Sequence, residues 1–577
     1  MKSSDYIVEF FERKGIKHFF GYQGTMIAHL VDSIYRNKNV NNHCCYNEQG
    51  AGFAAVGSAK ATGDLAVAYA TSGPGAANLI SAIADAYYDS APVIFITGQL
   101  NTYEYLNIDG IRQNGFQEMD VISSVKAITK YCAKVEKIDD LRFILEKSYY
   151  TATEGRPGPV VIDLPMDMQR QEVEPEKLKQ FVPELRLEND NSNTIAKAIV
   201  KALKESKAPV LLLGNGLRND SGACDTIIDI AKNCNIPVIT SMLGRDLLAY
   251  DDGINMGHLG GGYGHRYANI IIDKKADLII SLGCSMCKRQ TAMKTEEFAK
   301  NAKIIRVDID SKELERKVHE SEQSYLADCR KVIDAIEKYK SEIPVFESWL
   351  EKCKKIRKML ELFDDGCAER KPNKFVEEIS RNIDDNTIIC CDVGQHQVWT
   401  SQSFLLKKNQ KLLFSGGHGA MGFALPAAIG ASIAEGKRAV AICGDGAMQM
   451  NIQELQWVFR EQLPVSVVVL NNSSLGLIQQ QQDDIFDGVY AGSLDSGGYL
   501  APDFHRIGKA YGIDSVQVTS IDDLSKALKQ ADMNKPFLAE VILDPKSRAY
   551  PKTFFGERMY NQRPYIPAGL MEEILKA

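Results

Sequence analysis

Two oxygen-bearing side chains, Asp445 and Asn472, stand near the two ends of the stretch GDGAMQMNIQELQWVFREQLPVSVVVLNN. Each follows a run of strand-forming residues, and a helix-length of chain separates them. Because a helix between parallel strands brings their carboxyl ends side by side, both side chains could reach one ion. Carboxylate and amide oxygens, together with phosphate oxygens, suit Mg²⁺ rather than zinc. An ordinary polar sheet edge would use the same residue types, so the spacing alone leaves both interpretations open.

Glycines flank Asp445 on both sides. Gly444 and Gly446 have no side chain, so their backbone N–H groups could approach the phosphates of a ligand closely. The residues MNIQELQWVFREQ that follow predict a helix whose N-terminus points to the same place. A phosphate and magnesium site is therefore one of the two functions open to this stretch.

A third chemical group, the carboxylate of Glu48, opens a helix of small residues in YNEQGAGFAA. Small side chains indicate a helix face that packs closely against another element, where an unpaired charge is costly. Glu48 could be a helix-terminal carboxylate stabilised by the helix dipole. It could equally be a reactive group held beside a ligand.

The elements that must position these residues alternate between short buried strands and helices, which is typical of an α/β fold with parallel sheets. Polar segments at 170–193 and 340–372 predict linkers. We expect three doubly wound parallel-sheet domains, over residues 1–170, 190–335 and 365–577. Buried strands are expected at 65–71, 92–97, 159–164, 209–214, 276–283, 303–310, 438–444 and 464–472.

The first and third domains look alike in sequence. Residues 50–75 and 419–446 both read as a glycine-rich helix, a short turn, a buried strand and a glycine loop. We interpret this as a diverged internal repeat, although any two βα units share some of these sequence features. If the repeat is real, two similar domains face each other and share a site.

Composition limits the class of protein. The net charge of −7 is mild for 577 residues and argues against nucleic acid or a membrane surface as a partner. No apolar run approaches the ~20 residues that span a bilayer, and the N-terminus does not resemble a secretory signal. The thirteen cysteines are scattered and match no zinc-finger spacing. We expect a cytoplasmic globular protein with reduced thiols.

Several motifs together give the chain a specific resemblance to one family. GDG, 24 residues and then NN is the signature of thiamine-diphosphate enzymes. The whole chain resembles the acetolactate synthase group of these enzymes, in all three expected domains. The motifs are YNEQGAGFAA (46–55), TSGPG (71–75), GFQE (115–118), GRPGPVVIDLP (155–165), DVGQHQVW (392–399), SGGHGAMGFALPAAIGA (415–431) and GDGAMQMNIQEL (444–455).

The resemblance implies thiamine diphosphate and Mg²⁺ as cofactors. It places Mg²⁺ on Asp445, on Asn472 and on the backbone carbonyl of Ser474. The diphosphate contacts it implies are Gln395, His396, Gly444, Gly446 and Ala447.

The resemblance also implies roles around the reacting part of the cofactor. Glu48 would hydrogen-bond a pyrimidine ring nitrogen and so promote formation of the reactive ylide. Met421 would lie under the cofactor and hold it bent. Gln117 and Phe116 would line the substrate channel, and Gly73 belongs to a tight loop near the same cleft.

Three positions depart from the biosynthetic acetolactate synthases. Met166 stands where the family has a lysine, and Gln481 stands where it has a tryptophan important for acceptor choice. In GCSMCKR (283–289), Ser285 replaces an arginine near the flavin, while Arg289 is kept. Glycine loops at 214–216 and 256–261 and the strand end at 307–310 keep FAD binding open. The alternative is a middle domain that has kept the fold and lost the nucleotide.

By this resemblance, the chain decarboxylates pyruvate or a related 2-oxo acid and transfers the two-carbon unit to a carbonyl acceptor, as a homodimer or homotetramer with sites between subunits. A polar residue at 481 suits a hydroxylated acceptor such as a keto-sugar nucleotide, and a simple decarboxylase is the other alternative. A flavin oxidase and a non-catalytic homologue are hypotheses from other classes. The segment 283–289 departs from the family's flavin-contacting pattern, which argues against the oxidase. The presence of Glu48, Asp445 and Asn472 argues against the non-catalytic homologue.

Overall fold

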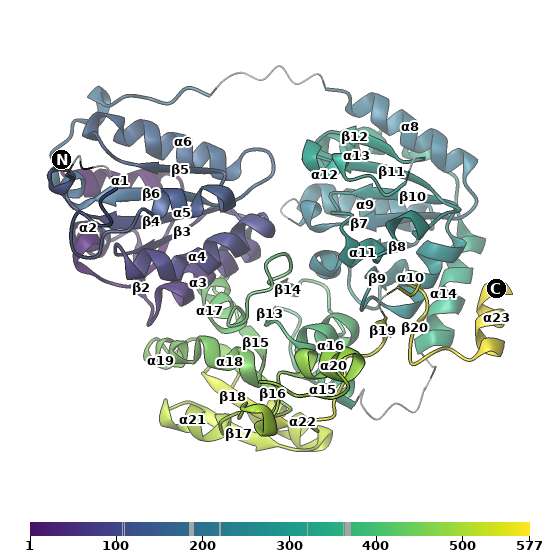
Figure 1. Ribbon diagram of the computed structural model, residues 1–577. Helices are drawn as coiled ribbons and strands as arrows, with labels where there is room; N and C mark the ends of the chain where they lie inside the picture. The colour runs from purple at the N-terminus through teal and green to yellow at the C-terminus, as the bar shows by residue number, and fades with distance from the viewer. Residues whose placement is uncertain are drawn as a thin grey trace.

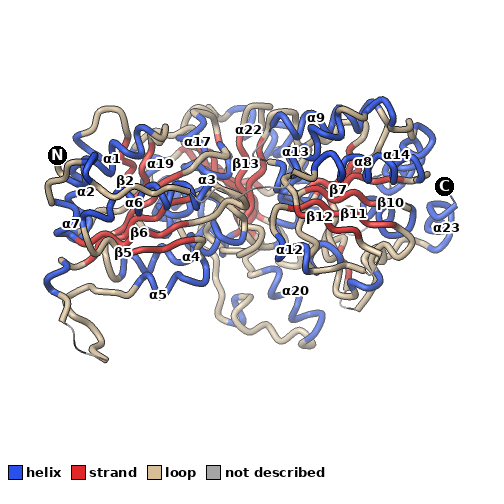
Figure 2. The backbone as a smooth tube through the Cα atoms, turned by 90° about the horizontal axis from the view of Figure 1, so that it is seen from above, coloured by secondary structure: helices blue, strands red, loops and turns tan. Residues whose placement is uncertain are grey.

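Three six-stranded parallel sheets, each flanked by helices, make up the molecule in the computed structural model (Figure 1). The structure describes residues 1–106, 108, 110–183, 190–218, 221–319, 321–361, 363, 371–554 and 556–576. The expected fold class is confirmed, and each predicted buried strand is present. The expected domain boundary at 365 lies outside the described residues, and the other boundaries stay predictions. In the view from above, the C-terminal sheet lies between the other two (Figure 2).

The N-terminal sheet has the strand order β2-β1-β3-β4-β6-β5. Its strands are β1 (His18–Gly21), β2 (Asn41–Cys44), β3 (Ala66–Ala70), β4 (Val93–Gln99), β5 (Tyr131–Lys134) and β6 (Val160–Pro165). Its helices are α1 (Ser3–Arg13), α2 (Ala28–Arg36), α3 (Glu48–Thr62), α4 (Pro74–Tyr88), α5 (Val121–Val125), α6 (Leu141–Thr153) and α7 (Met166–Arg170).

The C-terminal sheet repeats that topology, with the order β14-β13-β15-β16-β18-β17. Its strands are β13 (Ile388–Cys391), β14 (Lys411–Phe414), β15 (Ala439–Gly444), β16 (Val465–Asn471), β17 (Asp514–Val518) and β18 (Phe537–Ile542). The same order in both sheets confirms the internal repeat. The helices of this domain include α15 (Lys371–Asn382), α16 (Gln395–Ser403), α17 (Ala424–Glu435), α20 (Gly476–Ile485), α21 (Phe504–Ala510) and α22 (Ile521–Gln530).

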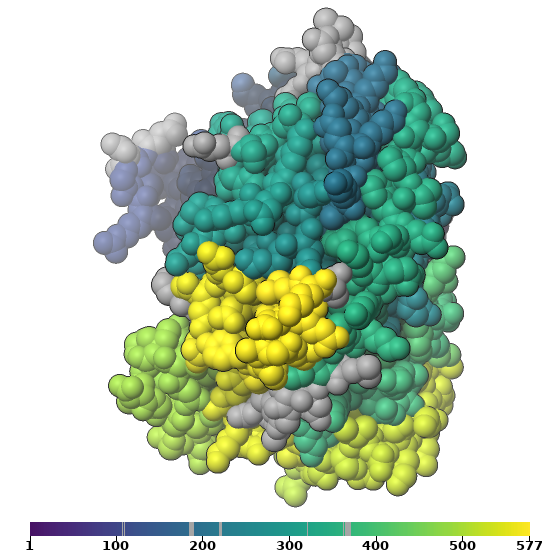
Figure 3. Space-filling model, turned by 90° about the vertical axis from the view of Figure 1, so that its right-hand side faces the viewer, coloured from purple at the N-terminus to yellow at the C-terminus, as the bar shows by residue number. Residues whose placement is uncertain are grey.

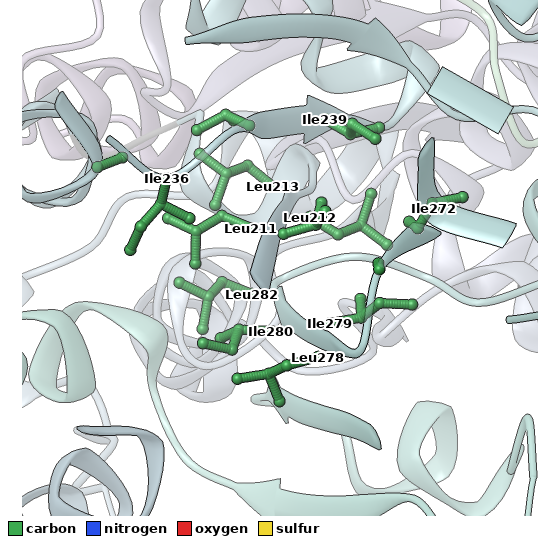
Figure 4. Close-up of a cluster of buried hydrophobic side chains, with 14 of the residues drawn as sticks. Leu211, Leu212, Leu213, Ile236, Ile239, Ile272, Leu278, Ile279, Ile280 and Leu282 are labelled. Carbon is green, nitrogen blue, oxygen red and sulfur yellow. The ribbon is translucent and has the colours of Figure 1, made fainter. Parts of the chain in front are cut away.

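The middle sheet has a different order, β12-β11-β10-β7-β8-β9. Aliphatic side chains from its strands form a continuous core between the flanking helices (Figure 4). The strands are β7 (Pro209–Leu213), β8 (Val238–Thr240), β9 (Asn255–His258), β10 (Leu278–Leu282), β11 (Lys303–Asp308) and β12 (Gln323–Leu326). The helices are α8 (Ser192–Glu205), α9 (Ser221–Asn233), α10 (Arg266–Ile270), α11 (Lys288–Thr291), α12 (Ser311–Glu315), α13 (Cys329–Glu337) and α14 (Glu347–Glu361).

Helices α3 and α17 join the two repeated domains, and they lie side by side in Figures 1 and 2. A Cβ on Gly57 would lie 2.3 Å from the carbonyl oxygen of Ala427, and one on Gly430 would lie 1.9 Å from that of Ala54. The two helices therefore touch through their backbones at equivalent positions of the repeat. Only glycine allows so close an approach.

The C-terminal segment leaves its own domain and packs on the middle one. It forms the short strands β19 (Lys552–Thr553) and β20 (Gln562–Arg563) and ends in α23 (Ala568–Lys576). The N–H of Thr553 donates to the carbonyl of Gly262 at 2.8 Å, and Ile574 is fully buried. In Figure 3 this segment, in yellow, covers the junction between the two domains.

The prediction of one continuous helix over MNIQELQWVFREQ is wrong. The chain instead forms α18 (Asp445–Met450), a 3₁₀ turn η12 (Ile452–Glu454) and α19 (Leu455–Arg460). At the break, Asn451 has φ −135° and its side chain donates to the carbonyl of Gly422 at 2.8 Å. This tertiary bond competes with helical hydrogen bonding, as asparagine side chains often do. The described part of the chain contains no helix long and apolar enough to cross a membrane.

Candidate active site

The carboxyl ends of β15 and β16 bring Asp445 and the end of the NN pair together. One carboxylate oxygen of Asp445 accepts the N–H of Gly446 at 3.0 Å, and the other accepts the N–H of Ser474 at 2.9 Å. Asn472 is buried in the same place. The three residues predicted for Mg²⁺ therefore lie at one strand edge, as expected from the parallel pairing of the two strands.

Gln395 and His396 follow β13 and begin α16 at the same edge of the sheet. The side-chain N–H of Asn472 donates to Oε1 of Gln395 at 3.0 Å, which leaves the amide oxygen of Asn472 as the atom for a cation. A Cβ on Gly444 would lie 2.6 Å from Nδ1 of the His396 ring. Glycine at 444 is thus required for the ring to reach the strand end. The site occupies the switch point between β13 and β15, where open α/β sheets bind ligands.

Buried polar atoms without partners show where a polar ligand fits. Among the described residues, Nε2 of His396 and Oγ of Ser474 are both buried and unpaired. Burial lowers the pKa of His396 to about 3, so its ring is neutral, and burial raises the pKa of Asp445 to about 6. Unpaired buried polar groups are costly, so the residues present fit an anionic ligand with a cation. No cluster of three His, Cys, Asp or Glu side chains that could hold a metal occurs in the described ranges.

Met421 lies directly over the glycine loop. Its terminal methyl would be 3.3 Å from a Cβ on Gly446. The loop that carries Met421 is fixed by the buried carboxylate of Asp392, which accepts the N–H groups of Gly422 at 2.9 Å and Ala424 at 2.8 Å. Asp392 is a positioning residue that the sequence reading did not single out, although it opens the quoted motif DVGQHQVW.

The N-terminal domain holds a second polar cluster at the start of α3 and α4. Glu48 accepts a hydrogen bond from the side-chain amide of Asn78 at 2.9 Å and lies beside Gly75. The nearby hydroxyls of Thr71 and Ser72 are buried and have no partner among the described residues. Like the group around Asp445, this cluster contains buried polar atoms that have no partner among the described residues.

The GFQE turn packs over this second cluster. A Cβ on Gly73 would lie 2.5 Å from the carbonyl oxygen of Gln117, so the two loops touch through their backbones. Gln117 has φ 63°, an unusual value for a residue with a side chain. Backbone strain of this kind often accompanies functional sites. Phe116 beside it is exposed.

Within one chain the two clusters meet the domain interface at different places. Helix α3 contacts the C-terminal domain through Gln49, whose side chain accepts from Asn451 at 3.1 Å. Asn451 is at the far end of α18 from Asp445, which is about 9 Å of helix. The structure thus assembles the Glu48 group and the Asp445 group separately, and it does not bond one to the other in the described residues.

A cavity of about 450 Å³ lies between the three domains. It opens at the carboxyl ends of the middle strands, beside Gly216 and Gly283 at the switch point between β7 and β10. Ser285 lies on its wall and donates to Glu313 at 3.1 Å. Arg289 bridges to the C-terminal domain through Gln397 at 3.0 Å. The volume is within the range of small-molecule and cofactor sites.

The structure also locates the other departures from the family pattern. Gln481 is on the exposed face of α20, while its neighbour Gln480 is buried. Gln480 bonds the amide of Gln395 at 3.3 Å and the N–H of Ala549 at 2.9 Å, so it links the site to the C-terminal segment. Met166 is half-buried at the start of α7. No sequence pattern signals the Gln480 link, because the partner segment is distant in the chain.

Comparisons with known proteins agree with this geometry. The chain matches the family models described as thiamine pyrophosphate enzyme N-terminal TPP binding domain over residues 1–124, central domain over 196–336 and C-terminal TPP binding domain over 392–541. It is 34% identical to a probable acetolactate synthase large subunit of Methanocaldococcus jannaschii, covering 97% of this chain and 95% of the relative. It is 33% identical to acetolactate synthase 1 of Zea mays, described as chloroplastic, covering 95% and 86% of the two chains.

Proposed function

The chain belongs to the acetolactate synthase family of thiamine-pyrophosphate enzymes, and from this premise we propose which residues carry out its reaction. The reaction is thiamine-diphosphate-dependent decarboxylation of pyruvate or a related 2-oxo acid, with transfer of the acyl unit to a carbonyl acceptor. When bound, the cofactor supplies a carbon nucleophile and an electron sink for the loss of CO₂. The set of buried unpaired polar atoms around Asp445 is the observation that carries the assignment.

The C-terminal domain holds the charged end of the cofactor in this proposal. Asp445, Asn472 and the carbonyl of Ser474 bind Mg²⁺, because all three present oxygen at the ends of β15 and β16. His396 donates from Nε2 to the diphosphate, and the glycines around it let backbone N–H groups approach. Further contacts come from Gln395, Gly444, Gly446 and Ala447. Met421 supports the cofactor from the adjoining loop.

The N-terminal domain holds the pyrimidine end. Glu48 would hold a proton against a pyrimidine ring nitrogen, and its burial beside Gly75 would exclude water from that contact. Gly73 shapes the loop beneath it. Gln117 is close enough to this cluster, through the contact of its backbone with Gly73, to orient the 2-oxo acid.

A second copy of the chain completes the site in this proposal. The Glu48 cluster and the Asp445 cluster are not bonded to each other within one chain, and both domains carry exposed apolar residues. These are Tyr103, Ile108 and Phe116 in the N-terminal domain, and Ile485, Phe486 and Val489 in the C-terminal domain. Exposed apolar residues that gather into a patch mark an interaction surface. Light scattering of the purified protein should therefore give the mass of a dimer or tetramer, and a monomer that turns over substrate would contradict this arrangement.

FAD is proposed as the occupant of the cavity between the domains. Asp308 ends β11 on the cavity wall, where an acidic residue can bind ribose hydroxyls, and Arg156 and Arg289 supply positive charge. Ser285 in place of arginine removes one charged contact. A visible spectrum of the purified protein tests this directly. The visible absorption bands of oxidised flavin would support bound FAD. A colourless protein that does not take up added FAD would contradict it.

Gln481 bears on which carbonyl acceptor the enzyme uses. Its exposed position on α20, beside the buried Gln480 that contacts Gln395, is suited to the mouth of the site. We propose that this polar side chain admits a hydroxylated ketone as well as a second 2-oxo acid. Product analysis with pyruvate alone, and then with candidate ketones, separates the alternatives. Acetolactate from pyruvate alone indicates acetolactate synthesis, acetaldehyde indicates a simple decarboxylase, and CO₂ release only after adding a ketone indicates another acceptor.

A further inference from the structure

A tyrosine that no motif predicted reaches the glycine loop of the site. The hydroxyl of Tyr499 would lie 3.2 Å from a Cβ on Gly446. Its oxygen is buried and makes no well-formed hydrogen bond among the described residues, and the side chains of Asp445 and Gln449 lie close to it. A tyrosine hydroxyl can donate one hydrogen bond.

The segment between α20 and α21 delivers this hydroxyl. It is attached at Ser493, which is fully buried and whose carbonyl accepts the N–H of Leu475 at 3.0 Å. Leu475 directly follows Ser474, so the attachment point is beside the proposed metal ligands. Most of the segment on either side is exposed, including Val489 and Leu500.

A tight turn aims Tyr499 back toward the site. Gly498 has φ 96°, and a Cβ on Gly497 would lie only 1.7 Å from the carbonyl oxygen of Tyr490. The N–H of Gly492 donates to the carbonyl of Gly497, and that of Tyr499 to Leu494, both at 2.9 Å. These bonds fix the backbone at Tyr499, so the approach of its ring to Gly446 is a built feature of the fold.

Three buried side-chain groups without a well-formed hydrogen bond then lie near the stretch Gly444–Gly446 or beside Asp445. They are Nε2 of His396, Oγ of Ser474 and the hydroxyl of Tyr499. His396 and Ser474 are both more than nine-tenths buried. Each of the three can donate a hydrogen bond, and several donors in one part of a site suit the oxygens of an anion. Leaving a buried donor unpaired is costly, so a ligand that accepts from all three would be bound tightly.

We propose that the hydroxyl of Tyr499 donates a hydrogen bond to the diphosphate of thiamine diphosphate and so fastens the segment 486–500 to the bound cofactor. This inference rests on the proposed function, because it needs the diphosphate at Asp445. It adds a cofactor-binding residue outside the GDG and NN motifs. It also predicts that bound cofactor holds the exposed segment that follows α20 more firmly in place.

Calorimetric titration of the cofactor-free protein with thiamine diphosphate in the presence of MgCl₂ tests the contact. Tyr499→Phe removes only the hydroxyl, and a lost hydrogen bond to a charged group should weaken binding about tenfold or more. Tyr490→Phe is the matched control, because its hydroxyl belongs to the same segment but donates to Asp483 at 2.6 Å. This control should bind like the wild type. Inorganic pyrophosphate with MgCl₂ is a second probe, and Tyr499→Phe should weaken its binding as well.

Hydrogen exchange over residues 486–500 gives a readout independent of activity. Adding thiamine diphosphate should slow exchange in the wild type and in Tyr490→Phe, and much less in Tyr499→Phe. Equal affinity and equal protection in Tyr499→Phe and wild type would overturn the inference while leaving the proposed function intact. Equal losses in both tyrosine variants would overturn it too, because the effect would then come from the segment as a whole. A wild-type protein that does not bind thiamine diphosphate would overturn the proposed function together with this inference.

Discussion

At the scale of the residue, Asp445 has two tasks that one carboxylate can perform together. Its two oxygens accept the N–H groups of Gly446 and Ser474, which fixes the orientation of the side chain. An ionised carboxylate has about four acceptor positions, so lone pairs are left for a cation. The same N–H groups partly offset the cost of burying the charge. The carboxylate is therefore held in place before any ligand arrives.

The charge of Asp445 can be tested with a near-isosteric change. Asp445→Asn keeps the shape but loses the negative charge, so the Mg²⁺-dependent affinity for thiamine diphosphate should fall by roughly tenfold to a hundredfold or more. Titration calorimetry at several MgCl₂ concentrations measures this fall. Asp487→Asn, an exposed change in the same domain, is the control. Unchanged Mg²⁺ dependence in Asp445→Asn would remove this residue from the metal site.

Glu48 is expected to act on the reaction rather than on cofactor affinity. Glu48→Gln keeps the hydrogen bond with Asn78 within reach but cannot exchange a proton, so kcat should fall at least about a hundredfold. Binding of thiamine diphosphate should stay within a few fold of the wild type. Steady-state rates of CO₂ release and calorimetry on the same samples separate the two effects. Retained turnover would falsify the role assigned to Glu48.

At the scale of the element, α3 and α17 show why the two halves of the repeat contain small residues. Ala54 to Gly57 read AAVG and Ala427 to Gly430 read AAIG. These matching turns cross each other, with each glycine facing the backbone of the opposite helix. The poor amphipathic pattern of both helices follows from this, because nearly every face of each is buried.

The crossing predicts a large effect for a very small change. Gly430→Ala would place a methyl group 1.9 Å from the carbonyl oxygen of Ala54, so the helices would have to separate. We expect a loss of about 1–3 kcal/mol or more in stability, seen as a lower melting temperature by circular dichroism. Gly569→Ala in α23, where no atom lies within 4 Å of the added methyl, should have little effect. Equal melting temperatures for the two variants would mean that the helices are not packed this closely.

At the scale of the whole molecule, buried polar contacts join domains that are far apart in sequence. The carboxylate of Glu454 accepts the N–H of Tyr46, just before the turn that carries Glu48, with both distances at 3.2 Å. Lys60 is buried between Asp85 of α4, Asp89 just after that helix, and the carbonyl of Phe414 in the C-terminal domain. The interface between the repeated domains is therefore held by charged groups as well as by the crossing of α3 and α17.

Glu454 makes this interface sensitive to pH. Burial raises its pKa from the ordinary 4.5 to about 7. Between these values the folded protein keeps a proton that the unfolded chain has lost. The contribution of Glu454 to the free energy of unfolding is therefore fully present below pH 4.5. It falls by at most about 3 kcal/mol as the pH rises to about 7.

Glu454→Gln should flatten this dependence. Glutamine carries no titrating proton, so the melting temperature should fall less between pH 5 and pH 8 in the variant than in the wild type. Thermal melts at several pH values measure the difference. Glu435→Gln is the control. Burial raises the pKa of Glu435, but Lys411 and Lys437 lower it by more, so the net shift is downward and Glu435 does not titrate between pH 5 and pH 8. Parallel curves for Glu454→Gln and wild type would show that Glu454 stays ionised in the folded protein.

The sequence by itself determined those features that depend on neighbouring residues. Strand ends, the glycine loop and the NN pair are local, and parallel pairing then forces Asp445 and Asn472 to one edge, because the helix between their strands leaves no other arrangement. The tertiary structure decided what depends on contacts between distant segments. It ended the predicted helix at Asn451, because that side chain bonds Gly422 from another loop. It also brought Tyr499 to Gly446 and Gln480 to Ala549, since no spacing in the chain records how closely two remote loops will pack.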